Sequence, residues 1–299
     1  MRGDSILIVG SIAIDTIEIG TERYENLLGG STTYATIAAG KYSDVNVVGV
    51  IGTDFPQNGH NIYNKYAANL IDLKVEQGKT FSWGGRYHDN FDKRDTLFTE
   101  LGVFGAFSPK LSLINKNQQF VFLANIHPSL QNSVINQCQA KPVIVIDTMN
   151  LWIETTLDEL LTVLSKSDIL LINESEAEML TGCLNLDDAA VKLIELGPPT
   201  VVIKRGSKGA VLYQKMGEKI KIGVYTIDKV IDPTGAGDTF GGGFVSALAQ
   251  GKTYKEALIL GSALASICVE GIGIDALEQA TITEIEHRQN ILKTRLHLE

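Results

Sequence analysis

The residues best suited to chemistry lie in one stretch, Val230–Phe244, which reads VIDPTGAGDTFGGGF. Strand-like residues lead into a Gly-Ala-Gly turn, and apolar residues then recur with helical spacing up to Gly251, which predicts a strand, a tight turn and the start of a helix. The amides of Ala236, Gly237 and Asp238 would point out of that helix start, with the positive end of the helix dipole behind them. The stretch therefore predicts a phosphate site.

Asp238 falls in the first turn of this predicted helix. Capping the helix N-terminus is one role that a carboxylate in this position can have, and it would explain the residue without any catalytic function. Beside a phosphate site it can also be the base of a phosphoryl transfer, because it can take a hydroxyl proton while the amides neutralise charge on the transferred group. We favour the second role. The glycines at 241, 242 and 243 each disfavour a helix by about 0.8–1.0 kcal/mol relative to Ala, so we expect a close approach to the backbone there.

Other nucleotide and metal signatures are missing from the sequence. There is no G-x-x-x-x-G-K-[ST] motif, and no G-x-G-x-x-G follows the first apolar run, where a dinucleotide fingerprint would lie. The three cysteines are widely spaced and the five histidines form no i, i+4 pair. We therefore expect neither a disulfide framework nor a zinc site.

Composition limits the class of protein. The 299 residues include 26 Lys and Arg against 35 Asp and Glu, a net charge of −9, which argues against a generic nucleic-acid binder. With 44% hydrophobic and 20% charged residues the chain is too rich in core residues to be disordered. The first apolar run is too short for a signal segment or a membrane span, so the expectation is a cytoplasmic protein without membrane contact.

The order of elements predicts the architecture. Apolar, strand-like runs alternate with helix-length segments, which is typical of parallel βαβ units with helices on both faces of one sheet. We predict one domain over residues 1–299, an α/β three-layer sandwich with a mostly parallel sheet. The expected strands are Ile6–Ile14, Val45–Ile51, Phe120–Ala124, Val143–Ile146, Ile169–Ile172 and Val201–Ile203, and the expected helices are Thr32–Tyr42, His60–Asn69, Ser129–Cys138, Thr156–Ser165, Ser175–Thr181 and Leu186–Leu196.

Two stretches, about 15–28 and 78–104, break the alternation. Both are polar, aromatic and strand-like, and Lys79–Tyr87 followed by Asp95–Val103 predicts a hairpin across a polar turn that includes Asp92 and Lys93. Such strands would form a small β-lid over a site, or an edge hairpin that serves only as surface. We favour the lid, and covering its aromatic residues would allow a homodimer through it.

The motifs resemble the ribokinase-like (PfkB) family of carbohydrate and nucleoside kinases. Asp-Pro-Thr-Gly-Ala-Gly-Asp-Thr-Phe at 232–240 is similar to the family's C-terminal signature, and Leu28-Gly29-Gly30-Ser31 with Val48–Asp54 is similar to the N-terminal one. Asn173-Glu174-Ser175-Glu176 matches its N-x-x-E element, and Lys204–Ala210 matches its nucleotide loop. The matches run in family order over nearly the whole chain.

The resemblance implies a role for each matching residue. Asp238 would be the base, and Gly235, Ala236 and Gly237 the anion hole for the γ-phosphate of ATP. Nucleotide and Mg²⁺ would be bound by Asn173, Glu176, Lys204, Gly206, Gly209, Gly271 and Gly273, with Glu176 acting on Mg²⁺ through water. Separately, Asp232 and Thr234 would hold a monovalent cation such as K⁺, or else only stabilise a turn.

On the acceptor side the resemblance implies that Asp15, Gly29 and Gly30 bind hydroxyls. The chain departs from the family at Tyr34, where many sugar kinases carry a polar amide, and a tyrosine could stack on a ring or close the pocket. Arg86 and Arg94 could reach a phosphorylated acceptor from the lid. Weaker acceptor candidates end other strands on the same edge: His127, Asp147 and Asn150.

The expected activity is ATP-dependent phosphorylation of a hydroxyl on a sugar or sugar-containing small molecule. A nucleoside kinase of the same family is the nearest alternative. A non-catalytic nucleotide or sugar sensor is a second alternative, against which the intact Asp238 and Gly-Ala-Gly turn argue. A dehydrogenase is a third, and the missing N-terminal glycine fingerprint opposes it.

Overall fold

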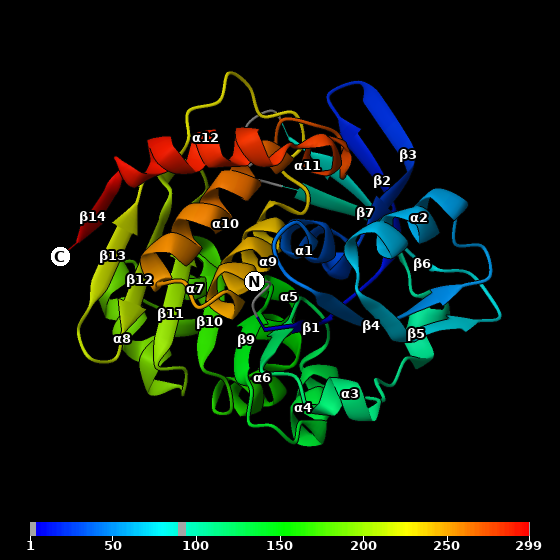
Figure 1. Ribbon diagram of the computed structural model, residues 1–299, viewed down its shortest axis with the longest axis horizontal. Helices are drawn as coiled ribbons and strands as arrows, with labels where there is room; N and C mark the ends of the chain where they lie inside the picture. Colours follow the sequence, from blue (N-terminus) through cyan, green and yellow to red (C-terminus); the bar gives the residue numbers. More distant parts are fainter. Residues whose placement is uncertain (1–3, 89–93, 299) are drawn as a thin grey trace.

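The computed structural model describes residues 4–88 and 94–298 and arranges their strands in two sheets (Figure 1). In the larger sheet, seven neighbouring strands pair in parallel, from β11 (Thr200–Lys204) at one end of this group to β5 (Asn69–Glu76) at the edge of the sheet. Three further strands extend the sheet beyond β11 in antiparallel pairs. In spatial order the strands are β14 (Leu296–Leu298), β13 (Lys219–Ile222), β12 (Ala210–Gln214), β11 (Thr200–Lys204), β10 (Ile169–Asn173), β9 (Val143–Asp147), β8 (Phe120–Leu123), β1 (Ile6–Val9), β4 (Val45–Gly52) and β5 (Asn69–Glu76).

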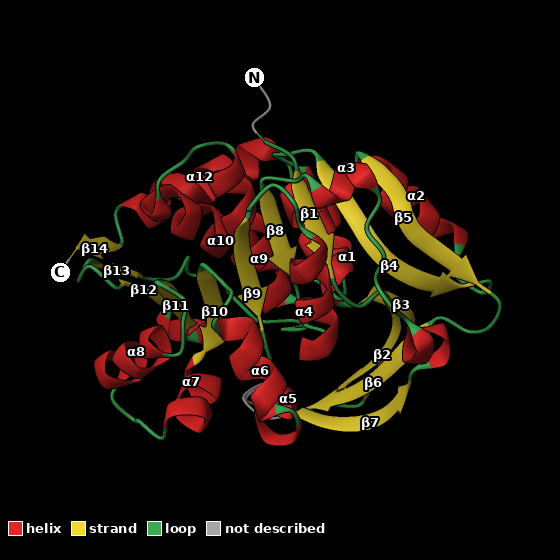
Figure 2. Cartoon of the chain, turned by 90° about the horizontal axis from the view of Figure 1, so that it is seen from below, coloured by secondary structure: helices red, strands yellow, loops and turns green. Residues whose placement is uncertain are grey.

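Helices cover both faces of this sheet, as Figure 2 shows from below. One face packs against α1 (Ser31–Gly40), α2 (Gln57–Tyr66), α9 (Ala236–Ala249), α10 (Tyr254–Cys268), α11 (Asp275–Gln279) and α12 (Ile282–Lys293). The other packs against α4 (Pro128–Gln137), α5 (Asn150–Thr155), α6 (Leu157–Leu164), α7 (Glu174–Thr181) and α8 (Leu186–Glu195). Short turns complete the set: α3 (Leu113–Lys116), η1 (Gly102–Ala106) and η2 (Gly206–Lys208).

Strand β1 shows why the sequence gives three layers. Ile6 and Ile8 enter the core on one face and Leu7 and Val9 enter the core on the other, and all four are fully buried. Successive side chains of a strand point to opposite faces, so a run that is apolar throughout must be covered on both sides. The predicted α/β sandwich with a mostly parallel sheet is confirmed.

A second, four-stranded sheet stands off the main body (Figure 2). Its strands β6 (Phe81–Tyr87) and β7 (Arg94–Glu100) pair antiparallel, so the predicted hairpin is present. Asp92 and Lys93 of the predicted turn lie outside the described residues. Strand β2 pairs with β3 and, in parallel, with β6. The strand order is β3 (Glu22–Gly29), β2 (Ala13–Ile19), β6 (Phe81–Tyr87) and β7 (Arg94–Glu100).

The prediction of one strand over Ile6–Ile14 is wrong. The run forms two strands, because the chain leaves the large sheet at Gly10 and enters the second sheet at Ala13. A Cβ on Gly10 would lie 2.4 Å from the Ser31 Oγ, so this crossing packs tightly against the start of α1. Asp15 therefore lies inside β2, in the second sheet, rather than at the end of the first strand.

The sequence reading also missed strands at the edges of the large sheet. Strand β5 occupies Asn69–Glu76, and the helix expected over His60–Asn69 is instead α2, which ends at Tyr66. Ile71 and Val75 of β5 are exposed, which blurs the apolar pattern of a buried strand. The antiparallel strands β12, β13 and β14 were likewise not predicted.

The glycines of α9 let neighbouring elements approach its backbone. A Cβ on Gly242 would lie 2.4 Å from the carbonyl oxygen of Ala35 in α1, and one on Gly243 would lie 2.7 Å from Leu264 Cδ1 in α10. The predicted close approach is therefore made by helices of the same chain at Gly242 and Gly243, and at Gly241 by Phe122 of β8, whose Cζ would lie 2.4 Å from an added Cβ. It holds α9, and with it the residues at its N-terminus, firmly in the core.

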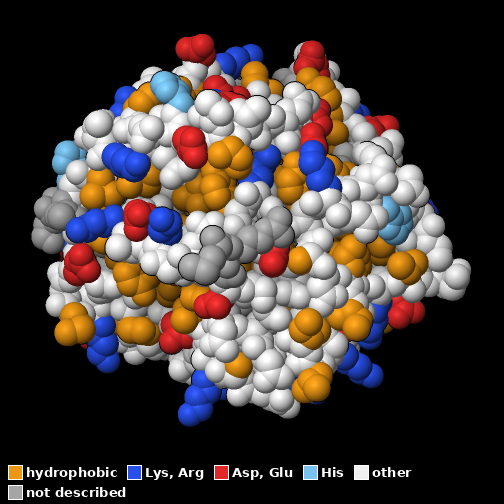
Figure 3. Space-filling view, in the orientation of Figure 1, with side chains coloured by type: hydrophobic (Ala, Val, Ile, Leu, Met, Phe, Trp, Pro, Cys, Tyr) orange, Lys and Arg blue, Asp and Glu red, His pale blue; other side chains and the backbone are white. Residues whose placement is uncertain are grey.

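No helix in the described part of the chain is both long and apolar enough to cross a membrane. On the face drawn in Figure 3, acidic and basic side chains lie interspersed rather than gathered by sign.

Candidate active site

A cleft of about 510 Å³ lies where β9, β10 and β11 end, and it is bounded by residues of both sheets. The carboxyl edge of a parallel sheet is where open α/β folds bind ligands, because loops and helix N-termini converge there. The lining residues are Tyr87, Arg94, Asn125, Asp147, Thr148, Met149, Asn150, Asn173, Glu176, Lys204, Gly206, Pro233, Thr234, Gly235, Gly237 and Asp238.

The N-terminus of α9 opens into this cleft. Gly235 precedes the helix with φ of 73°, a left-handed conformation that glycine adopts without strain. In the described residues no backbone carbonyl accepts a hydrogen bond from the Gly237 amide, which leaves it available to an anion. The Ala236 amide donates to the Pro233 carbonyl at 3.2 Å, so the prediction of three free amides is wrong at that position.

Asp238 lies in the first turn of α9 and faces the cleft. Burial disfavours its charged form, and the negative charge of Asp147 adds repulsion, so the pKa of Asp238 rises to about 7. Lys204 and Arg94 oppose this rise. A carboxyl group with a pKa near neutrality can take up and release a proton at working pH, which is what a general base requires.

Lys204 ends β11 and pairs with Asp147 at the end of β9, with 2.7 Å between Nζ and Oδ2. The other Asp147 oxygen accepts a hydrogen bond from the Thr148 amide at 2.9 Å. The lysine Nζ lies 3.2 Å from where a Cβ on Gly237 would be, so its charge is adjacent to the helix N-terminus. A positive group and a free amide thus meet at one point of the cleft.

Asn173 and Glu176 form the capping box of α7. The Asn173 side chain accepts from the Glu176 amide at 2.8 Å, and Glu176 Oε2 accepts from the Asn173 amide at 3.0 Å. Burial raises the pKa of Glu176 to about 7, with Lys204 opposing the shift and Asp147 adding to it. The two residues therefore stabilise a helix and also present polar groups to the cleft.

Asp15 lies in β2, nearly fully buried, against Gly29 and Gly30, which precede α1. Gly29 packs so closely that a Cβ there would lie 1.8 Å from Asp15 Oδ2. Burial raises the pKa of Asp15 to about 7, against a hydrogen bond from Gly30 that lowers it. Within the described residues Asp15 Oδ1 has no hydrogen-bond partner. The three predicted acceptor residues are thus in contact with one another, but none lines the cleft.

Two further predicted acceptor residues do not reach the cleft either. Tyr34 is buried in the core beneath Gly235, so it cannot stack on a ligand, because helix α1 directs its ring inward. Arg86 points to the outer face of the second sheet, where it pairs with Glu18 at 2.7 Å. Side chains alternate along a strand, so in β6 it is Tyr87 that faces the cleft, and Arg94 of β7 joins it there.

The remaining predicted residues divide between cleft and scaffold. Gly206 and Asn150 line the cleft. Gly209 holds the turn between β11 and β12, where its carbonyl accepts from the Arg205 amide at 2.8 Å, and Gly271 packs on Ala276. His127 caps α4 by accepting from the Ser129 amide. Gly209, Gly271 and His127 are therefore scaffold residues here rather than cleft residues.

Asp232 and Thr234 belong to one hydrogen-bonded turn. Asp232 Oδ1 accepts from the Thr234 amide and Oδ2 from the Gly273 amide, each at 2.9 Å. The Thr234 hydroxyl donates to Tyr87 Oη at 3.0 Å, and its carbonyl accepts from the Cys268 thiol. These contacts fit the turn-stabilising alternative, because protein groups already engage both carboxylate oxygens.

Asn125, Thr148 and Met149 line the cleft but were not singled out in the sequence, and Tyr87 was expected only as part of the lid hairpin. Asn125 follows the apolar run of β8 on the same carboxyl edge as Asp147 and Asn173, and that position alone could have identified it. Tyr87 and Met149 have no comparable signal, because their placement depends on how the two sheets meet.

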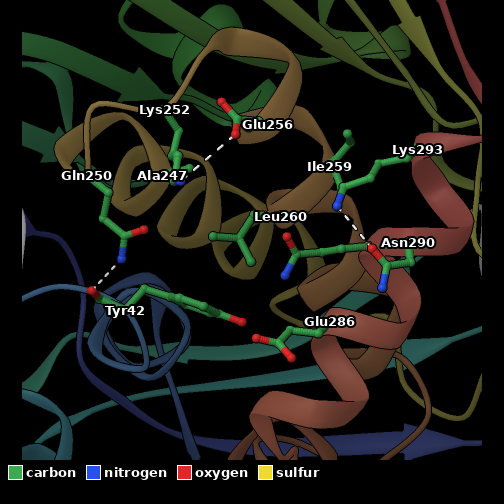
Figure 4. Close-up of a pocket in the computed structure, with 11 residues that line it drawn as sticks. Tyr42, Ala247, Gln250, Lys252, Glu256, Ile259, Leu260, Glu286, Asn290 and Lys293 are labelled. Atoms are coloured by element: carbon green, nitrogen blue, oxygen red, sulfur yellow. Dashed lines mark hydrogen bonds and ion pairs between the residues drawn. The ribbon is translucent and has the colours of Figure 1, made fainter.

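A second hollow, of about 360 Å³, lies between α9, α10 and α12 (Figure 4). Tyr42, Gln250 and Glu286 are among its lining residues, and none of the predicted site residues is. The first cleft is therefore the candidate active site.

Comparison with known proteins agrees with this geometry. The pattern of the pfkB family of carbohydrate kinases matches residues 4–280. The chain is 29% identical over 265 residues to a cytidine kinase of Thermococcus kodakarensis, covering 86% of this chain and 92% of that protein. It is 28% identical over 228 residues to a nucleoside kinase of Methanocaldococcus jannaschii, covering 75% of this chain and 72% of that one.

Solved structures show the same fold. The crystal structure of the Methanocaldococcus jannaschii nucleoside kinase superposes with a TM-score of 0.78 at 22% identity, over 97% of this chain and 99% of that one. Arabidopsis thaliana ribokinase, solved with ribose and ATP, superposes with a TM-score of 0.80 at 24% identity and the same coverage. The chain belongs to the pfkB family of carbohydrate kinases and is a sugar or nucleoside kinase.

Proposed function

We propose that this protein transfers the γ-phosphoryl group of ATP to a hydroxyl of a nucleoside, with Asp238 as the general base. The observation that carries the proposal is the cleft-facing Asp238 carboxylate, whose pKa is raised to about 7 beside the N-terminus of α9. In its charged form Asp238 takes the hydroxyl proton as the oxygen attacks phosphorus, and the bond from phosphorus to the bridging oxygen of ADP breaks.

The groups around Asp238 suit the charge that develops in this step. The Gly237 amide and the helix dipole attract the oxygens of the transferred phosphoryl group. Lys204 adds a positive charge at the same point. Because these donors are fixed by the packing of α9 and by the Asp147 ion pair, little reorganisation is needed when the reaction occurs.

The cleft residues also fit a magnesium ion that arrives with the nucleotide. Glu176 and Asp147 both line the cleft and provide carboxylate oxygens of the kind Mg²⁺ prefers. In the described residues no three Asp, Glu, His or Cys side chains are grouped closely enough to hold a metal alone. Bound there with phosphates and water, Mg²⁺ would neutralise phosphate charge.

The acceptor class rests on the comparisons. The relatives named as cytidine and nucleoside kinases match 86% and 75% of this chain, whereas the relatives named as ribokinases match 44% of it. Ribose is the second candidate, because the ribokinase fold is shared over nearly the whole chain. A nucleoside contains a ribose, so both acceptors present the 2-, 3- and 5-hydroxyls, whereas the anomeric hydroxyl of ribose is replaced by the base in a nucleoside.

A panel of acceptors scored by ADP release at fixed Mg-ATP tests the proposal. Cytidine, uridine, adenosine, guanosine, ribose and fructose 6-phosphate are compared by kcat/KM. We expect a nucleoside to exceed ribose at least tenfold. A higher value for ribose or for the phosphosugar would overturn the nucleoside assignment and leave the kinase assignment standing. ADP release that no acceptor stimulates would overturn both.

A further inference from the structure

Gln131 is a nearly fully buried amide on α4, the helix that follows β8. Its Nε2 lies within hydrogen-bonding distance of three backbone carbonyl oxygens, those of Leu123 and Ala124 at 3.2 Å each and that of Asp147 at 3.0 Å. A carbonyl can only accept, so the amide nitrogen rather than the amide oxygen must face all three. The side chain therefore joins the carboxyl ends of β8 and β9.

This link lies where the backbone pairing of the two strands stops. The pairing of β8 with β9 ends at Leu123 and Ile146, one residue before Asp147. Beyond that pair, the Gln131 amide supplies a connection between Asp147 and the end of β8. An NH₂ group has two hydrogens, and here it faces three acceptors, so it has no spare hydrogen for a ligand. Its role is therefore to hold the backbone.

Asp147 carries this constraint into the cleft. Its Oδ2 pairs with Lys204 Nζ at 2.7 Å, and its Oδ1 accepts from the Thr148 amide at 2.9 Å. Both charged groups lie near the N-terminus of α9, because a Cβ on Gly237 would lie 3.2 Å from Lys204 Nζ and 4.0 Å from Asp147 Oδ2. A shift of the Asp147 backbone would therefore move the lysine charge relative to that helix N-terminus.

We propose that Gln131 is a positioning residue for ATP: by holding the Asp147 backbone, it places the ion pair of Asp147 and Lys204 where Lys204 meets the phosphates. This rests on the proposed function, in which the charge of Lys204 acts on those phosphates. Gln131 does not itself line the cleft, so its effect on ATP passes through Asp147 and Lys204. Removing the amide donors frees the end of β9 and weakens ATP binding without removing any group that touches the nucleotide.

The test measures the Kd for Mg-ATP by calorimetry without an acceptor. Gln131→Met keeps the length of the side chain and removes its donors, so the Kd should rise about 5- to 20-fold. Gln137→Met is the matched control on the same helix. The Gln137 amide donates to the carbonyls of Pro109 and Ser133, at 2.9 and 3.1 Å, and both lie outside the cleft. This control should lower the Tm, as Gln131→Met does, but leave the Kd within twofold of the wild type.

A double-mutant cycle separates positioning from general stability. In the Lys204→Met background, Gln131→Met should change the Kd by less than twofold, because the lysine through which it acts is already gone. A rise as large as in the wild-type background would overturn the inference, and so would a Kd within twofold of the wild type in Gln131→Met alone.

Should Gln131→Met fail to fold, Gln131→Glu carries the test, because a carboxyl group of the same shape brings at most one hydrogen to the three carbonyls. A Kd within twofold of the wild type in that variant would overturn the inference. If the wild type binds Mg-ATP but no acceptor stimulates ADP release, the proposed function fails and the Kd values still test the inference. A wild type that does not bind Mg-ATP would overturn both.

Discussion

Gly235 lies directly against the ring of Tyr34, so that a Cβ on the glycine would lie 2.3 Å from the ring Cγ. Tyr34 is nearly fully buried, and its ring cannot move aside without disturbing the core. The turn that starts α9 is thereby fixed from below by a residue of α1. Both the positive φ and the close ring require glycine at this position.

Gly235→Ala should lower turnover roughly 100-fold or more, because the displaced helix N-terminus no longer presents its amide to the phosphoryl group. Steady-state kinetics and thermal unfolding measure the effect. The matched control is Gly217→Ala, where φ is 92° but nothing lies within 4 Å of the added Cβ. Near-wild-type turnover of Gly235→Ala would show that the packing does not position the site.

Arg94→Ala should lower kcat/KM about 10- to 100-fold, since this arginine lines the cleft and its charge acts on Asp238. Arg86→Ala removes the same charge from the same sheet but on its outer face, where it pairs with Glu18. Exposed pairs contribute little, so that variant should stay within twofold of the wild type. The reverse ranking of the two variants would contradict the placement of these strands.

Lys204→Met should raise the KM for ATP and lower the free energy of unfolding. Removing the lysine leaves the buried Asp147 carboxylate without its partner, which costs about 3–5 kcal/mol for a well-buried pair. Urea denaturation and ATP titration measure the two effects. Lys208→Met removes a lysine that is 63% exposed and should change neither quantity appreciably. Unchanged ATP affinity in Lys204→Met would exclude the lysine from the nucleotide site.

Three carboxyl groups, the buried Asp15 and Glu176 and the half-buried Asp238, should make the unliganded protein less stable as pH rises. Burial raises the pKa of each to about 7, whereas the unfolded chain titrates near 4. Between those values the folded state binds more protons, so the free energy of unfolding falls with rising pH and levels off above about pH 7.

Asp238→Asn isolates one of these groups. At pH 5 the wild-type carboxyl is neutral, and the Tm of the two proteins should be similar. At pH 8 the wild type buries a charge that the variant lacks, so the variant should have the higher Tm. A Tm difference that stays constant between pH 5 and pH 8 would mean that the pKa of Asp238 is not raised.

The sequence predicted features that depend on local pattern. Helix α9 begins at Ala236, as the turn and helix pattern around Gly235 indicated, whereas the strand expected just before that turn is not formed: no strand lies between Ile222 and Ala236, a span that the structure describes in full. Features that depend on how distant segments meet were mispredicted. Tyr34 faces the core because α1 packs under α9, and Arg86 faces outward because of the alternation in β6, whose register with β2 no local pattern specifies.

If Asp238 is the general base, the Asp238→Asn variant should lose turnover but retain ATP binding. Asparagine keeps the shape of the side chain but cannot take the hydroxyl proton, so kcat with the best acceptor should fall roughly 1,000-fold. The affinity for Mg-ATP, measured by calorimetry, should change no more than a fewfold. A kcat within tenfold of the wild type would contradict the assignment of Asp238 as the base.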